Sequence, residues 1–227
     1  MIVIVIISVL VVIGIYLVYA SYRIDSGIYV KALCRKKTDD KIVALTFDDG
    51  PDPTNTPPVL DVLRRYSVQA TFFCIGKRAE EQPDIIRRIQ QEGHLAGNHS
   101  YVHTPSFPLF STARMTADLQ QSQQVLERIT GTKIILFRPP YGVTNPMVRK
   151  VVCKLGYTVI GWSIRSFDTR KEEENRIFNR IVKQIKPGAV ILLHDRLPGS
   201  AALVMRLLDY LKRQGYKVVR IDKLFEL

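Results

Sequence analysis

Residues 42–51 read IVALTFDDGP, an apolar run that stops at two carboxylates and a Gly-Pro turn. A short run rich in apolar and β-branched residues is typical of a buried strand. Two adjacent carboxylates at the end of such a strand are costly unless a cation or hydrogen bonds hold them. The stretch therefore predicts a strand that delivers Asp48 and Asp49 to a site, in a folded domain that begins near Lys41.

Short apolar runs of this kind recur to the end of the chain. Longer stretches with apolar residues at three-to-four spacing separate the short runs, and these stretches tend to stop at a glycine, as helices do. Strands that alternate with helices predict an α/β fold with a parallel sheet and helices outside it. The further runs, which make seven with the first, lie at 70–76, 94–99, 134–138, 157–164, 189–194 and 216–221.

Polar residues cluster where these runs end. Carboxyl ends of parallel strands share one rim, which is where α/β folds build their sites. Two histidines four positions apart can aim at a single ion. Because five strand ends converge on one point, we expect a closed or nearly closed barrel rather than a flat sheet. The residues at these ends are Asp48, Asp49, His99, His103, Arg138, Trp162, Arg165, Asp168 and His194.

Each feature also has a structural interpretation. An Asp-Asp-Gly-Pro run is a common turn, and a histidine on an apolar strand is often a core residue with one hydrogen bond. His94 falls at a strand start, so we expect it on the opposite rim in a structural role. Co-location of the remaining residues at one rim, in this order, favours a functional site.

These residues resemble the motifs of the polysaccharide deacetylases, the NodB homology domain of carbohydrate esterase family 4. The resemblance spans about residues 40–222, and it implies a distorted (β/α)7 barrel and a metal-dependent hydrolase that releases acetate from an acetylated glycan. The matching motifs are TFDDGP at 46–51, HSYVH at 99–103, RPPYG at 138–142 and Leu-Leu-His at 192–194.

The fourth motif departs from the family pattern. Family members commonly carry Asp-x-x-Asp-Trp there, whereas this chain has Arg-Ser-Phe-Asp-Thr at 165–169. Asp168 keeps the second acid, but Arg165 and Thr169 replace the first acid and the tryptophan. Loss of that indole is expected to alter a wall of the sugar-binding groove more than the chemistry.

The resemblance also implies a role for each site residue. Asp49, His99 and His103 would bind a divalent metal, most simply zinc, with cobalt or manganese as alternatives. Asp48 would be the general base and His194 the general acid. Arg138 and Asp168 would orient those two groups, in a pairing that the sequence leaves open. A backbone N–H near Tyr141 would hold the oxyanion, and Pro140, Trp162 and Leu192 would join Tyr141 in contact with the substrate.

Three functions remain open at this point. The first is removal of N-acetyl groups from an N-acetylhexosamine polysaccharide, such as peptidoglycan or a chitin-like glycan. The second is O-deacetylation of an acetylated polysaccharide, of the acetylxylan-esterase type, with the same site. The third is a non-catalytic barrel that binds glycan or another polyanion. The presence of every ligand, the base and the acid favours an enzyme.

Residues 1–20 carry no charge and almost no polar side chain. Twenty helical residues span about 30 Å, the thickness of the hydrocarbon core of a bilayer. A cleaved signal peptide is the alternative, with Val18-Tyr19-Ala20 as a cleavage site, but no basic residue precedes the run. We expect a transmembrane anchor or uncleaved signal at 1–20, a polar tether at 21–40 and the catalytic domain at 41–227.

The orientation of this anchor has two opposing signals. Basic residues at 23–37 would draw the following domain into the cytoplasm. A large domain can cross the membrane regardless, and the resembled family usually works outside it. We therefore expect a single pass in the cytoplasmic membrane with the domain on the extracytoplasmic side.

Composition sets further limits. The 227 residues are 46% hydrophobic and 24% charged, which excludes a disordered or collagen-like chain. The cysteines are Cys34, Cys74 and Cys153, an odd number without zinc-ligand spacing. The net charge of +12 predicts attraction to a polyanion. Because no nucleic-acid motif is present, we expect no nucleic-acid partner but a surface that faces anionic lipid or wall polymer.

Overall fold

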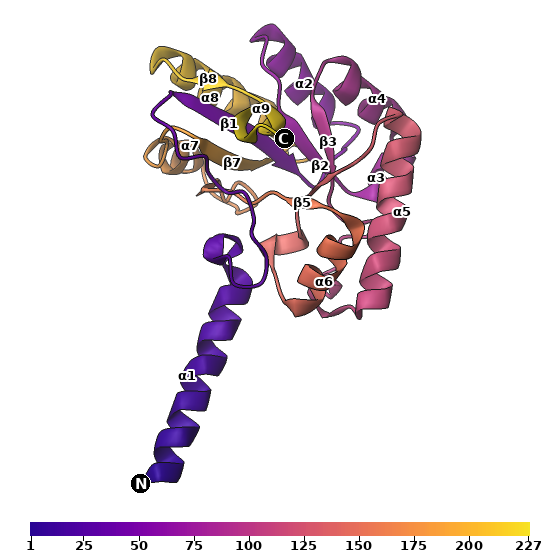
Figure 1. Ribbon diagram of the computed structural model, residues 1–227. Helices are drawn as coiled ribbons and strands as arrows, with labels where there is room; N and C mark the ends of the chain where they lie inside the picture. Colours follow the sequence, from indigo (N-terminus) through magenta and orange to yellow (C-terminus); the bar gives the residue numbers. More distant parts are fainter.

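The structure, a computed structural model of residues 1–227, is a curled sheet surrounded by helices, and it confirms the predicted distorted α/β barrel (Figure 1). All paired strands are parallel, in the order β5-β4-β3-β2-β1-β7-β6, with β8 beside the start of β1. The strands are β1 (Ile42–Asp48), β2 (Thr71–Cys74), β3 (Leu95–Asn98), β4 (Leu136–Phe137), β5 (Thr158–Val159), β6 (Ile164–Arg165), β7 (Ala189–His194) and β8 (Lys217–Val218).

The sheet has eight strands rather than the expected seven, because the run at 157–164 forms two strands. These two, β5 and β6, are the edges of the sheet, and the chain crosses the gap between them. Arg138 explains the break, since its Nε and Nη2 donate to the carbonyls of Ile160 and Gly161. Those carbonyls therefore serve the site instead of a continuous strand.

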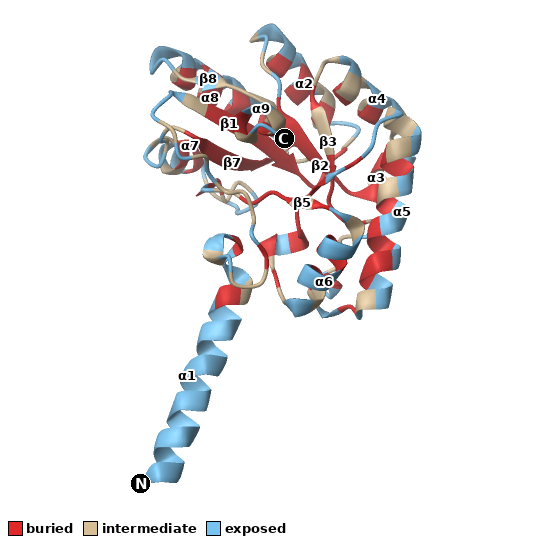
Figure 2. Ribbon diagram, viewed as in Figure 1, coloured by how far each residue is buried: buried red, intermediate tan, exposed pale blue.

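Helices cover the outside of the barrel, and buried residues line the interface between them and the sheet (Figure 2). Side chains alternate along β1, so that Val43, Leu45 and Phe47 join this outer core. These helices are α2 (Thr56–Arg65), α3 (Gly76–Glu81), α4 (Pro83–Gln91), α5 (Thr112–Thr130), α6 (Pro146–Leu155), α7 (Glu174–Val182) and α8 (Ser200–Arg213). The remaining elements of the domain are α9 (Ile221–Phe225) and the short 3-10 turns η1 (Ile24–Ser26), η2 (Phe107–Leu109) and η3 (Pro140–Gly142).

The inner face of the barrel has its own small core. Ala44 and Phe73 from the strands pack there with Ile221 and Leu224 of α9. Because α9 follows β8, which pairs with the first residues of β1, this core fills the amino-terminal end of the barrel. The carboxyl-terminal end remains available for polar residues.

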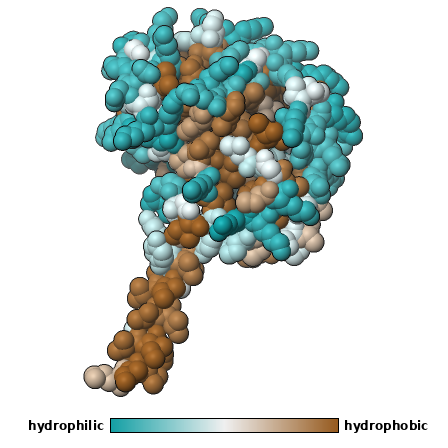
Figure 3. Space-filling model, in the orientation of Figure 1, coloured by the Kyte–Doolittle hydropathy of each residue, from teal (hydrophilic) through white to brown (hydrophobic).

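The N-terminal helix α1 (Ile2–Tyr22) extends away from the domain, and of its residues only Ala20 is buried (Figure 3). It is long and apolar enough to cross a membrane, a property that a signal sequence shares. The structure thus provides the helix that the sequence predicts at 1–20.

Residues after α1, for which the sequence predicts a polar tether at 21–40, pack against the barrel. Ile24 and Val30 are buried, and the backbone of Leu33 pairs with Ile160 beside β5. Arg35 forms a second bridge with Ala189. The physical reason is that β5 is a sheet edge, and its free N–H and C=O groups accept this segment.

Candidate active site

One pocket lies at the carboxyl-terminal rim of the strands. It brings together eight of the residues predicted from the sequence, which come from loops far apart in the chain. Arg138 and Asp168 lie behind the pocket, and each contacts one of its carboxylate or imidazole groups. The eight residues are Asp48, Asp49, His99, His103, Tyr141, Trp162, Leu192 and His194.

Asp48 ends β1 on the inner face, two residues after Thr46. Arg138 donates from Nη1 to Asp48 Oδ1 at 2.7 Å and to Thr46 Oγ1 at 2.9 Å. Because the guanidinium also donates to two backbone carbonyls, each nitrogen of this fully buried cation has at least one acceptor. Asp48 is therefore fixed through Oδ1, while its Oδ2 lies 3.8 Å from His99 Nε2.

Asp49 follows in a left-handed backbone conformation, with φ of 72°. This turn separates its carboxylate from that of Asp48 and directs Oδ1 toward His99 Nε2 at 3.5 Å and His103 Nε2 at 3.3 Å. Burial alone would raise the pKa of Asp49, but the surrounding histidines His99, His103 and His194 hold that pKa well below its usual range.

The residues Asp49, His99 and His103 fit a divalent metal. Their ligand atoms all lie within 4.8 Å of one another. His99 Nδ1 lies 2.7 Å from the Arg138 carbonyl, which can only accept, so that Nδ1 carries the proton and the Nε2 lone pair faces Asp49. Burial, together with neighbouring His99, lowers the pKa of His103 to about 3 and so favours the neutral ring that a metal needs.

His194 occupies the opposite side of the pocket at the end of β7. Asp168 accepts from the His194 ring at Nδ1, 2.7 Å away, and its second oxygen accepts from the His194 backbone N–H. Although burial opposes the charged ring, the hydrogen bond and charge of Asp168 raise the pKa of His194 above its ordinary value. The Nε2 atom is left facing the pocket, 3.9 Å from Asp49 Oδ2.

The pairing that the sequence left open is thus Arg138 with Asp48 and Asp168 with His194. Both pairs are nearly free of solvent, since their side chains are between 0% and 13% exposed. Arg138 holds Asp48 by Oδ1, and Asp168 holds His194 by Nδ1. Asp48 Oδ2 and His194 Nε2 are left facing the pocket.

The turn after β4 forms one wall of the pocket. Tyr141 has φ of 62°, and its ring packs on His103 with centroids 4.8 Å apart. A side chain at Gly142 would collide with Trp162, so the indole lies directly against this turn. Pro140, which we expected to contact substrate, is instead buried and does not line the pocket. It acts through the backbone by stiffening the turn.

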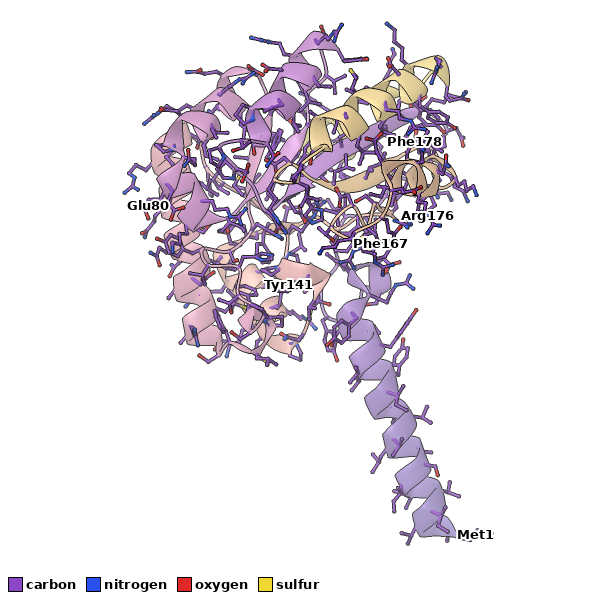
Figure 4. The ribbon with its side chains drawn as sticks, turned by 180° about the vertical axis from the view of Figure 1, so that it is seen from behind. Met1, Glu80, Tyr141, Phe167, Arg176 and Phe178 are labelled. Atoms are coloured by element: carbon purple, nitrogen blue, oxygen red, sulfur yellow. The ribbon has the colours of Figure 1, made fainter.

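The residues that depart from the family pattern also line the pocket. Arg165 and Thr169 both face it. The Arg165 guanidinium lies 5.4 Å from the Trp162 ring and 4.9 Å from the Phe167 ring, and it has no carboxylate partner. Figure 4 shows Phe167 and Tyr141 on the side of the domain next to α1.

Sequence reasoning missed several residues that support Asp49. Arg196 donates from Nε to Asp49 Oδ2 at 3.0 Å, and Arg78 donates to the Asp49 carbonyl at 2.9 Å. Buried Asp195 accepts from Thr56 Oγ1 at 2.5 Å beneath the Gly50 turn. Only the position of Asp195 and Arg196 directly after the Leu-Leu-His motif could have drawn attention to them.

Known proteins with similar sequences are deacetylases, as the same motifs predict. The sequence model of the polysaccharide deacetylase family matches residues 35–160. A peptidoglycan-N-acetylglucosamine deacetylase of Bacillus cereus is 38% identical, with 82% of this chain and 89% of the relative aligned. The peptidoglycan-N-acetylmuramic acid deacetylase PdaA of Bacillus subtilis is 34% identical over 88% of this chain and 80% of its own length.

Solved structures are similar as well. A peptidoglycan N-acetylglucosamine deacetylase superposes with a TM-score of 0.80 at 32% identity, covering 85% of this chain and 92% of that one. A pseudoenzyme of carbohydrate esterase family 4 from Bacillus anthracis gives a TM-score of 0.78 at 29% identity, with coverage of 84% and 67%. The fold is therefore shared by active and inactive proteins, and the side chains of the pocket must decide between them.

Proposed function

The chain belongs to the polysaccharide deacetylase family, and we propose that it removes N-acetyl groups from the hexosamines of peptidoglycan. The activity class, hydrolysis of an acetyl group on a polysaccharide, follows from the family. The substrate is proposed because two curated relatives are named for the N-acetylglucosamine and N-acetylmuramic acid of peptidoglycan.

A single observation carries this proposal. The base Asp48, the three metal ligands and the acid His194 line one pocket, and Asp48, His99 and His194 are each oriented by a hydrogen bond. Since a related pseudoenzyme shares the fold, the fold alone would not support catalysis. The complete set of oriented groups does.

The first chemical requirement is an activated water. A divalent ion on Asp49, His99 and His103, of which zinc suits these ligands, would acidify a water and polarise the acetyl carbonyl. Asp48 takes the water proton at Oδ2, because Arg138 already engages Oδ1. Arg196 neutralises the remaining oxygen of Asp49, which keeps the two adjacent carboxylates from repelling each other.

The second requirement is charge stabilisation and a proton for the leaving amine. The Tyr141 backbone N–H donates to no acceptor in the protein, so it is available to the developing oxyanion. His194 delivers a proton from Nε2 to the amine, and Asp168 stabilises the charged ring that carries it. The products are acetate and a free amino sugar.

Measurement of released acetate tests the substrate class. We expect release from N-acetylglucosamine oligomers and from purified peptidoglycan, and little from O-acetylated xylan. Release from xylan alone would instead establish the O-deacetylase that uses the same site.

We further propose that α1 anchors the enzyme in the cytoplasmic membrane with its domain on the outer side. The exposed, apolar helix and the location of the proposed substrate support this arrangement. Protease treatment of intact cells tests it, since an outward domain is degraded and an inward one is protected.

A further inference from the structure

The end of α1 is fixed to the catalytic domain without a free linker. Thr144 donates its N–H to the Ser21 carbonyl at 2.9 Å, and Tyr29 donates its hydroxyl to the Leu17 carbonyl at 3.3 Å. Ser26 also bonds to the Ala20 carbonyl. If α1 spans a bilayer, the loops that contact its last turns must therefore lie at the membrane surface.

An exposed apolar surface surrounds this junction. It is formed by Val18 and Tyr22 of α1 together with Pro105, Pro108, Leu109 and Val143, and we call it the junction surface. Leu109 is 82% exposed, although its neighbours Phe107 and Phe110 are buried. Asn145 Nδ2 donates to the Pro108 carbonyl, so the backbone that presents Leu109 is held in place. Exposed apolar patches of this kind mark interaction sites.

Basic side chains flank the junction surface. Helix α6 exposes Arg149, Lys150 and Lys154, contains no acidic residue and forms no salt bridge. It lies at the end of the domain from which α1 leaves (Figure 1). Arg114 is exposed nearby, with its guanidinium 3.8 Å from the Phe110 ring.

The basic residues at the opposite end differ. Arg64, Arg87 and Arg88 lie on α2 and α4, and each forms an ion pair with an aspartate or glutamate. The end next to α1 combines unpaired cations with Leu109, an apolar side chain that is 82% exposed. That combination is complementary to an anionic bilayer, which offers negative headgroups above hydrocarbon.

We infer that the junction surface and the exposed face of α6 dock on the anionic phospholipid bilayer that α1 spans, with Leu109 inserted among the lipids. The inference rests on the proposed anchor. Tyr141 connects the junction surface to catalysis, because its side chain borders both that surface and the catalytic pocket. The pocket then opens at the bilayer surface, and the enzyme acts on acetylated glycan close to the membrane.

A fluorescence experiment on the full chain tests the docking. In a background with Cys34 and Cys153 changed to Ser, Leu109→Cys is labelled with the environment-sensitive dye NBD and reconstituted in vesicles containing phosphatidylglycerol. We expect blue-shifted emission and several-fold stronger quenching by doxyl-labelled lipid than for a label at Lys212→Cys, an exposed position on α8. Equal, weak quenching at both positions, with α1 resistant to carbonate extraction, would overturn the docking alone.

Two further experiments test whether the basic residues of α6 and anionic lipid contribute to the docking. Arg149→Glu combined with Lys150→Glu should reduce quenching at position 109, as should vesicles of pure phosphatidylcholine, whereas Lys212→Glu combined with Arg213→Glu should not. If neither the double substitution on α6 nor the phosphatidylcholine vesicles reduce quenching at position 109, anionic lipid has no role in the docking. Release of the chain by carbonate would contradict the anchor, and the docking with it.

Discussion

At the scale of single residues, the site depends on how two adjacent carboxylates are separated. Asp48 lies on the strand and is held by Arg138, whereas Asp49 leaves the strand in a left-handed conformation and faces two histidines. The same residue type thus receives two environments one position apart. In the proposed mechanism, this division allows one carboxylate to bind a metal and the other to accept a proton.

Replacement of the base tests this division. We expect Asp48→Asn to lower the rate of acetate release by roughly 10²–10⁴-fold, because the amide cannot accept the water proton. Zinc binding, measured by calorimetry, should persist, since Asp49 and both histidines are unchanged. Asp61→Asn on α2 is the matched control and should retain full activity; equal activity of the two variants would remove Asp48 from the mechanism.

Arg165 tests substrate choice. Its unpaired guanidinium in the pocket is suited to a carboxylate on the glycan, such as that of a muramic acid. We expect Arg165→Met to raise KM for carboxylate-bearing glycan on the order of 10-fold, the worth of one hydrogen bond to a charged group. Steady-state kinetics on N-acetylglucosamine oligomers should change little, and a similar loss on both substrates would contradict this role.

His94 predicts how stability depends on pH. It lies at the start of β3, away from the pocket, where its Nδ1 accepts from the Ala70 N–H, and burial lowers its pKa to about 4. The unfolded chain therefore binds this proton first, so stability present above pH 6.5 is lost as the pH falls toward 4, by about 3 kcal/mol. His94→Asn keeps the acceptor and should flatten denaturant-measured stability across this window; an unchanged slope would exclude His94 as its cause.

At the scale of elements, the sequence predicted the strands that lead to the site better than it predicted the sheet edges. Runs such as 42–47 and 189–194 are apolar throughout because both faces of their strands are buried, and they appear as β1 and β7. The run at 157–164 looked similar but divides, because the Arg138 guanidinium takes two of its carbonyls. Such a long-range contact leaves no local pattern.

The segment after α1 escaped prediction for the same kind of reason. Residues 24–36 show no clean periodicity in sequence, yet they cover the β5 edge and bury Ile24 and Val30. The contact partners lie more than a hundred positions away, as Arg35 and Ala189 show. No periodicity within the segment could have indicated them.

Truncation tests the contribution of this segment. We expect a domain of residues 41–227 to be less stable than one of residues 23–227 by about 3 kcal/mol or more, the worth of two buried aliphatic side chains. Thermal unfolding of both proteins measures the difference. Identical midpoints would show that the packing of residues 23–40 on the barrel adds nothing to its stability.

At the scale of the whole molecule, the proposed function depends on a few acidic and histidine residues in a basic chain. The pocket residues were predicted well, because strand ends in a parallel barrel must meet at one rim. Arg138 and Asp168 were also predicted as the orienting partners, but which of them pairs with Asp48 and which with His194 depends on the curl of the sheet. The net charge of +12 predicted a negatively charged partner but not where on the surface that partner binds.

The proposed reaction is release of acetate from peptidoglycan through the Asp49-His99-His103 metal site. The most direct measurement is acetate released from purified peptidoglycan by the full chain before chelation, after chelation and after zinc is restored. We predict activity that chelation abolishes and zinc recovers. Activity that survives complete removal of metal, or no acetate from any N-acetylated glycan with metal bound, would contradict the account.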